Sequence, residues 1–213
     1  HRELILPQLA GPGVAAHEVK RLSGFKVIYG PIRSKDLTTF LDSGRNATPE
    51  MRIKNFGTLE RIALIPMELV SAMKVGFVIM GILFFLGFIW KSKEGMGVAL
   101  DHGLFSALAF FVAIVMGAIL SPLLLPWLPG RAFSPKGLVL GLIAALLLIA
   151  FSFSKFNAMA GGVEMLAWLF LIPAVSAYLA MNFTGASTYT SLSGVRKEMR
   201  WALPVQIGAG VIG

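Results

Sequence analysis

Four long apolar runs between residues 69 and 183 limit most strongly what this chain can fold into. A hydrocarbon core of about 30 Å needs roughly 20 apolar residues in a helix, and each run is about that long. Only short polar loops separate the runs. They extend over 69–90, 103–125, 137–153 and 163–183. The sequence therefore predicts an all-α membrane bundle.

A fifth apolar run begins at residue 201 and continues to residue 213, where the sequence stops. It rises only about 20 Å as a helix, too little for a full span, so we expect a truncated fifth helix. At the other end, His1 enters a strand-like segment without an initiator Met. We therefore expect an internal fragment of a longer protein, with its transmembrane domain over 69–213.

Basic residues near the ends of these runs are divided unequally between the two sides. Eight lie on the side of the N-terminal segment and three on the opposite side. Lys and Arg concentrate in short cytoplasmic loops, so we predict a multi-pass protein of the cytoplasmic (inner) membrane whose soluble part faces the cytoplasm. The eight are Arg52, Lys54, Arg61, Arg131, Lys136, Arg196, Lys197 and Arg200, and the three are Lys91, Lys93 and Lys155.

Composition excludes several other classes. The chain is 56% hydrophobic and 14% charged, which is typical of membrane proteins rather than of globular ones. It has no Cys, so these residues hold no disulfide framework or Cys-ligated metal. The basic residues behind the net charge of +8 are spread over the soluble portion and the loops, so we expect the lipid bilayer and no nucleic acid as a partner. No hydrolase triad, P-loop or zinc motif is present.

Residues 1–46 have the pattern of a small α/β segment. The expected order is a strand over 3–6, a helix over 14–22, a strand over 26–29 and a helix that ends before Gly44. This order is typical of a parallel, Rossmann-like sheet. Because two strands bury too little surface to form a domain, we expect residues 1–46 to be its C-terminal part, with the other strands before His1.

The loops that follow these two strands form the candidate ligand site. Ligands of parallel sheets bind beyond the carboxyl ends of the strands, and glycine lets the backbone approach a large flat or phosphorylated ligand. Glycines that only form tight turns give the same pattern, so both interpretations stay open. The candidate residues are Pro7, Gln8, Gly11, Pro12, Gly13, Val14, Tyr29, Gly30 and Pro31.

Residues 47–68 are polar and basic, and Thr58 is placed to begin a helix. Its basic flanks suit an interfacial helix on anionic head groups, and a plain linker helix fits equally well. Among isolated residues, His17 is expected on the surface and His102 at the end of its run as an interfacial cap. Lys74 and Glu164 lie near run ends, where snorkelling or capping explains them.

Several segments resemble a known family. HRELILP (1–7) and GFKVIYGPIR (24–33) resemble the last part of the corrinoid-binding domain in the large subunit of the acetyl-CoA-pathway corrinoid iron-sulfur protein. GVAAHEV (13–19), ATPEMR (47–52), NFTGASTYTS (182–191) and a bundle of about five membrane helices resemble the membrane-anchored corrinoid proteins of microbial mercury methylation. The resemblance covers essentially the whole chain, and the membrane helices distinguish the second family from the first.

This resemblance implies a corrinoid-dependent methyltransferase. A cobalamin-type corrinoid would receive a methyl group from a folate-linked donor and deliver it to Hg(II), forming methylmercury, and a ferredoxin-like iron-sulfur protein would be the reductant. The family's cobalt-ligating Cys would lie upstream, so no catalytic or metal-ligating residue is assigned here. Two alternatives stay open: a membrane-bound corrinoid methyl carrier for another acceptor, such as a metalloid or an acetyl-CoA-pathway enzyme, and a membrane transporter or scaffold with a regulatory soluble domain.

Overall fold

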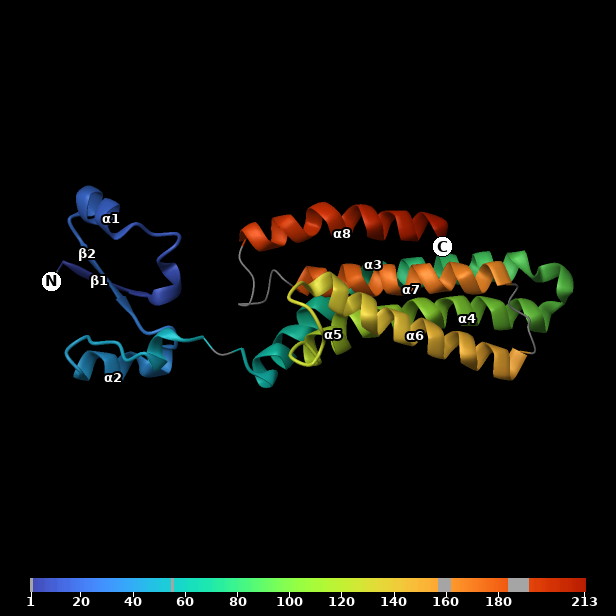
Figure 1. The fold of residues 1–213 in the computed structure, drawn as a ribbon, viewed down its shortest axis with the longest axis horizontal. Coiled ribbons are helices and arrows are strands. Elements are labelled where there is room, and N and C mark those ends of the chain that lie inside the picture. The colour runs from blue at the N-terminus through green and yellow to red at the C-terminus, as the bar shows by residue number, and fades with distance from the viewer. Residues whose placement is uncertain (1, 55, 157–161, 184–191) are drawn as a thin grey trace. The chain divides into compact units, whose positions relative to one another are not determined.

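The structure is a computed structural model that describes residues 2–54, 56–156, 162–183 and 192–213. It divides into two compact units, His1–Asn55 and Phe56–Gly213 (Figure 1). The first is a small α/β unit and the second is a helical bundle. The predicted combination of a short α/β segment with a helical bundle is therefore present.

The N-terminal unit contains a parallel pair of strands. Its elements are β1 (Glu3–Pro7), the 3-10 turn η1 (Gln8–Ala10), α1 (Ala16–Ser23), β2 (Lys26–Gly30), η2 (Ser34–Asp36), α2 (Leu37–Asp42) and η3 (Glu50–Arg52). Strand β1 pairs with β2 along its whole length. Gly24 ends α1 in the left-handed conformation, at a φ of 72°, which favours glycine. The predicted order of strands and helices is confirmed, as a two-stranded sheet.

Phe40 forms the centre of this small unit. Its side chain on α2 is completely buried. A Cβ added to Gly30 would lie 3.0 Å from Ile5 Cγ2 and 3.3 Å from Phe40 Cε1. The end of β2 therefore packs tightly on both side chains, and this packing explains the glycine at position 30. Nearby, the Ile32 N–H donates to the carbonyl oxygen of Met51 at 3.0 Å, which joins η3 to the segment after β2.

The second unit consists of long helices. They are α3 (Thr58–Trp90), α4 (Met96–Ile114), the π-helical segment η5 (Val115–Leu120), α5 (Ser121–Leu123), α6 (Phe133–Phe156), α7 (Gly162–Asn182) and α8 (Leu192–Ile212), with the 3-10 turn η4 (Ser92–Glu94) after α3. Within the described part of the chain, four helices are long and apolar enough to cross a membrane: Thr58–Trp90, Met96–Leu123, Phe133–Phe151 and Gly162–Asn182. The four predicted spans are therefore confirmed by length and composition.

Two helix boundaries differ from the prediction. The sequence predicts a separate helix within 47–68 before the first span, whereas α3 is one continuous helix of 33 residues that includes Pro66. The predicted start of the transmembrane domain at residue 69 thus lies inside α3. The helix continues because its first turns pack on the bundle, where Arg61 and Ile65 are buried. Likewise, α8 begins at Leu192 rather than at residue 201. The charged residues before 201 form its first turns.

Glycines allow the closest contact between membrane helices. A Cβ on Gly141 of α6 would lie 2.5 Å from Pro173 Cα of α7, and one on Gly137 would lie 2.5 Å from the Ser176 carbonyl oxygen. The Ser176 hydroxyl also donates to the Gly137 carbonyl oxygen at 2.8 Å. Small residues four positions apart let helix backbones approach closely in lipid. Pro173 itself is buried in α7.

Candidate functional site

The parallel register brings the two predicted loops to one edge of the sheet. Leu6 lies opposite Tyr29, and Pro7 lies opposite Gly30. Both strands end there, so the loop after β1 and the segment after β2 leave from the same edge. This is the edge at which parallel sheets bind ligands. The prediction that the two segments share an edge is therefore confirmed by the strand pairing.

The loop after β1 is a compact series of turns. The Gly11 N–H donates to the Gln8 carbonyl oxygen at 3.2 Å, and the N–H groups of Gly13 and Val14 donate to that of Ala10 at 3.0 and 2.9 Å. The Tyr29 hydroxyl on β2 donates to the carbonyl oxygen of Val14. This hydrogen bond fixes the far end of the loop to the neighbouring strand, so the two halves of the candidate site form one surface.

The two loop glycines differ in how tightly their surroundings confine them. Gly11 and Gly13 are both exposed, and neither has a positive φ. A Cβ added to Gly13 would meet only the Ala10 carbonyl oxygen, at 3.8 Å. A Cβ added to Gly11 would lie 3.3 Å from the Gln8 carbonyl oxygen. Neither strain nor close packing explains Gly13. The loop therefore offers an open stretch of backbone, which fits the close approach of a large planar ligand.

The other candidate residues differ in their accessibility. Pro7 and Pro12 are exposed, and Gln8, Val14 and Tyr29 are half-buried. Gly30 and Pro31 are buried in the small core of the unit. The surface that a ligand can reach thus consists mainly of residues 7–14 and the edge of Tyr29. Gly30 and Pro31 are buried beneath this surface.

No metal centre forms in the part of the chain that the structure describes, where no group of three or more His, Asp or Glu side chains comes together. His17 lies on α1 with its side chain 83% exposed, and its Nε2 is 3.7 Å from Glu18 Oε1. The predicted surface position of His17 is therefore confirmed.

His102 differs from its prediction as an interfacial cap. It is buried on α4, and its Nδ1 lies 3.3 Å from Oε1 of Glu164 on α7. The two residues are far apart in sequence, so the apolar pattern gives no sign that they meet. Their contact joins the second turn of α4 to the first turn of α7. Lys74, in contrast, is exposed on α3, as its predicted snorkelling requires.

A cavity of about 550 Å³ lies between α3, α4, α7 and α8. Its walls are mostly apolar, with Glu68, Asn182 and Gln206 among the few polar residues that line it. Gln206 is buried, and its Nε2 donates to the Ser134 hydroxyl at 2.9 Å. The hydroxyl-rich loop of the family resemblance lies over 184–191, outside the described residues.

Comparisons with protein-family models, with curated proteins and with solved structures found no match to this chain. The functional interpretation therefore depends on the geometry of the two units and on the patterns in the amino-acid sequence.

Replacing Tyr29 by Phe is expected to loosen the loop after β1. The substitution removes the only donor of its hydrogen bond to Val14, a loss of about 1 kcal/mol. Amide hydrogen exchange of residues 8–14 should become roughly fivefold faster. Tyr178→Phe in α7 is the matched control and should leave exchange in this loop unchanged. Equal exchange in the wild type and the Tyr29 variant would show that the hydroxyl does not hold the loop.

Proposed function

We propose that this chain is the membrane-bound part of a corrinoid-dependent methyltransferase that forms methylmercury from Hg(II). The observation that carries the proposal is the open backbone at Gly13, held at the carboxyl edge of a parallel strand pair by the Tyr29–Val14 hydrogen bond. The family resemblance supports a corrinoid as the planar ligand. The strand–helix–strand–helix order supports a Rossmann-like domain around it.

Residues 7–14 would hold one edge of the corrin. Gly11 and Gly13 would let the backbone approach the ring, and Pro7 and Pro12 would keep the loop rigid, since proline restricts its own φ. Tyr29 would position the loop through Val14. The bound corrinoid supplies cobalt chemistry that moves a methyl group to a soft acceptor such as Hg(II). The chain's own residues thus provide binding and orientation.

The membrane unit would keep this chemistry at the inner face of the cytoplasmic membrane. Four helices of sufficient length and apolar character support insertion, and the excess of basic residues on one side supports a cytoplasmic soluble part. A folate-linked methyl donor and a ferredoxin-like reductant belong to the proposal through the family resemblance.

Cobalt and corrinoid content of the purified full-length protein tests the cofactor. We expect about one cobalt per chain and a corrinoid absorbance spectrum. Gly13→Trp places a bulky side chain on the open loop, and a loss of about 1.4 kcal/mol of binding free energy would lower the corrinoid affinity roughly tenfold. His17→Ala is the control, because the His17 side chain is exposed on α1. A cobalt-free wild type, or full occupancy in Gly13→Trp, would contradict the proposed site.

Cells that carry or lack the gene test the acceptor. Deletion should abolish methylmercury formation, and the intact gene should restore it. Unchanged methylmercury output after deletion, with corrinoid still bound by the purified protein, would favour a corrinoid carrier for another acceptor.

One observation favours a second function, transport. Titratable residues inside a membrane often line ion or substrate pathways. The buried His102 and the half-buried Glu164 form a contact of this kind between α4 and α7. A stable full-length protein without cobalt, whose transport activity is lost in His102→Ala, would support this alternative over the methyltransferase.

A further inference from the structure

We propose that Arg61 and Lys136 form an oxyanion-binding site in the membrane unit, at the end of the bundle where α3 and α6 begin. The ligand class is a phosphate-type oxyanion, supplied either by the head group of an anionic phospholipid or by free phosphate. This site is separate from the proposed corrinoid loops and does not depend on the methyltransferase function.

Arg61 is buried without enough hydrogen-bond partners. Its side chain is on the first turn of α3, and the residue is only 3% exposed. Nη2 donates to the Thr58 hydroxyl at 2.8 Å, but Nε and Nη1 are buried and have no partner within the described residues. Two nitrogen atoms of the guanidinium group, with three N–H donors between them, are therefore left for a ligand.

Lys136 provides a second buried cation at the same end of the bundle. It lies in the first turn of α6, is 8% exposed, and donates from Nζ to the Leu125 carbonyl oxygen at 2.6 Å. Lys136 and Arg61 are each about one helical turn from a member of the same apolar cluster, Phe133 on α6 and Leu64 on α3. Neither cation has a carboxylate within salt-bridge distance among the residues described.

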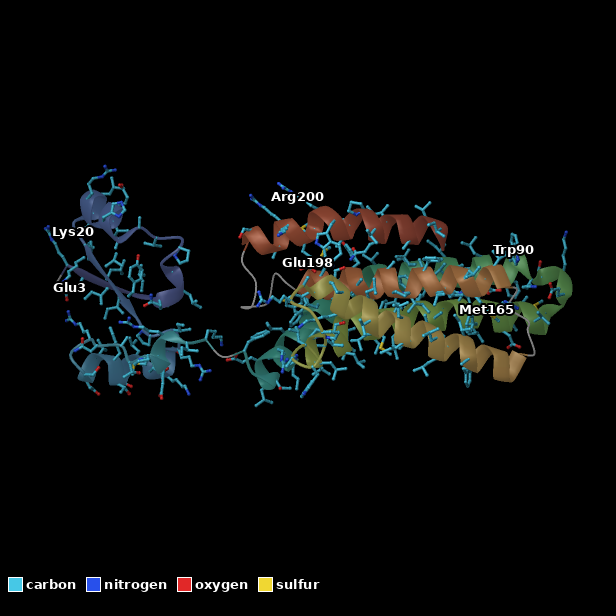
Figure 2. All side chains as sticks on the ribbon, in the orientation of Figure 1. Glu3, Lys20, Trp90, Met165, Glu198 and Arg200 are labelled. Carbon is cyan, nitrogen blue, oxygen red and sulfur yellow. The ribbon has the colours of Figure 1, made fainter. Side chains whose placement is uncertain are left out.

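Two neighbouring buried cations are unfavourable unless an anion accompanies them. A buried charge loses its hydration, and only a counter-charge with hydrogen bonds compensates for that loss. The α6 N-terminus adds positive potential at this end. Glu198 of α8, labelled in Figure 2, already accepts the Ser134 N–H at 2.6 Å through Oε1. Glu198 offsets one of the two positive charges, and an external oxyanion would balance the other and accept the free Arg61 donors.

The surroundings of the two cations suit a ligand at the membrane surface. An apolar cluster lies at the same end of the bundle and consists of Phe56, Leu64, Leu125, Phe133 and Phe183. Such a cluster excludes water and thereby strengthens charge-assisted hydrogen bonds. Arg61 and Lys136 are each the fourth residue of a helix that is long and apolar enough to span a membrane. Lys136 directly precedes the run at 137. Both positions match the head-group region of a bilayer.

Thermal unfolding of the purified full-length protein in detergent tests the site. Three additions are compared: phosphatidylglycerol, phosphatidylcholine and inorganic phosphate. We expect an anionic addition to raise Tm by about 5 °C, whereas phosphatidylcholine should have no effect. A response to phosphatidylglycerol alone identifies a lipid head group, and a response to inorganic phosphate identifies a free ion. No response to either anion overturns the proposal.

Substitutions of Arg61 and Lys136 test whether the increase in Tm comes from anion binding at these two residues. Arg61→Gln and Lys136→Gln should each lose more than half of the Tm increase, and Arg61→Lys should keep part of it. Arg200→Gln is the matched control, because Arg200 is exposed and points away from the bundle (Figure 2). A full increase in Arg61→Gln overturns the proposal. If that variant does not fold, native mass spectrometry decides, since wild type should retain one anion that Lys136→Gln loses; equal retention overturns it.

Discussion

Phe40→Ala is expected to unfold the N-terminal unit while the membrane bundle stays folded. Phe40 is 0% exposed and packs against Gly30 at the end of β2. Truncation of a buried Phe to Ala costs about 3–5 kcal/mol, and a unit of this size has little more stability than that. Limited proteolysis of the full-length protein should then cleave within residues 1–55 at least tenfold faster than in the wild type.

Leu41→Ala is the matched control for this substitution. Leu41 neighbours Phe40 on α2 but is 46% exposed, so its truncation removes few contacts. Its proteolysis rate should stay close to that of the wild type. Corrinoid content should fall in Phe40→Ala and persist in Leu41→Ala, because the proposed site needs the folded strand pair. Slow cleavage of Phe40→Ala would mean that Phe40 is not the centre of this unit.

Gly141→Leu is expected to disrupt the contact between α6 and α7. Even the first carbon of a side chain at this position would lie 2.5 Å from Pro173 Cα and 3.0 Å from Ser176 Cβ. The nearest atom belongs to the backbone, so the helices must move apart. Overpacking costs about 3 kcal/mol, which corresponds to a decrease in Tm of roughly 6–12 °C for a chain of this size. Thermal unfolding in detergent measures this decrease.

Gly81→Leu separates the effect of packing from that of losing a glycine. Gly81 lies in α3 and has no atom within 4 Å of an added Cβ. Leu also forms helix more readily than Gly. This variant should therefore unfold at or slightly above the wild-type Tm. A similar decrease in both variants would show that the close approach at Gly141 does not stabilise the bundle.

The main elements follow from the sequence because they depend on local pattern. Uninterrupted apolar runs predict the four long helices, and alternating strand and helix signals predict the small sheet. Parallel pairing then follows from the helix between the strands. The shared edge of the two loops follows in turn from parallel pairing. The continuous α3 does not follow, because Pro66 and the basic flanks are typical of a boundary, and only packing of the first turns on the bundle overrides it.

The contacts between membrane helices are harder to predict. A transmembrane helix is apolar on every side, so its pattern does not distinguish the face in lipid from the face against protein. For this reason the contact of His102 with Glu164 and the burial of Arg61 are visible only in the structure. The sequence does contain one signal: Gly137 and Gly141 are small residues four positions apart in an apolar helix, a pattern that indicates close packing. The buried position of Gly30 depends on Phe40, ten residues later in the chain.

The π-helical segment η5 also changes how the second span can be engineered. Each wider turn shifts the angular phase of all later residues relative to α4, so Gly117 comes to face α7, where its Cβ would lie 2.7 Å from Leu179 Cβ. The Ser121 hydroxyl donates to the Met116 carbonyl oxygen at 2.9 Å across this turn. A cysteine cross-link designed from a uniform 3.6-residue repeat through this span would therefore place residues after Ile114 on the wrong face of the helix. The helical positions from Ser121 onward need a separate assignment, and the same holds for a chimera joined within this span.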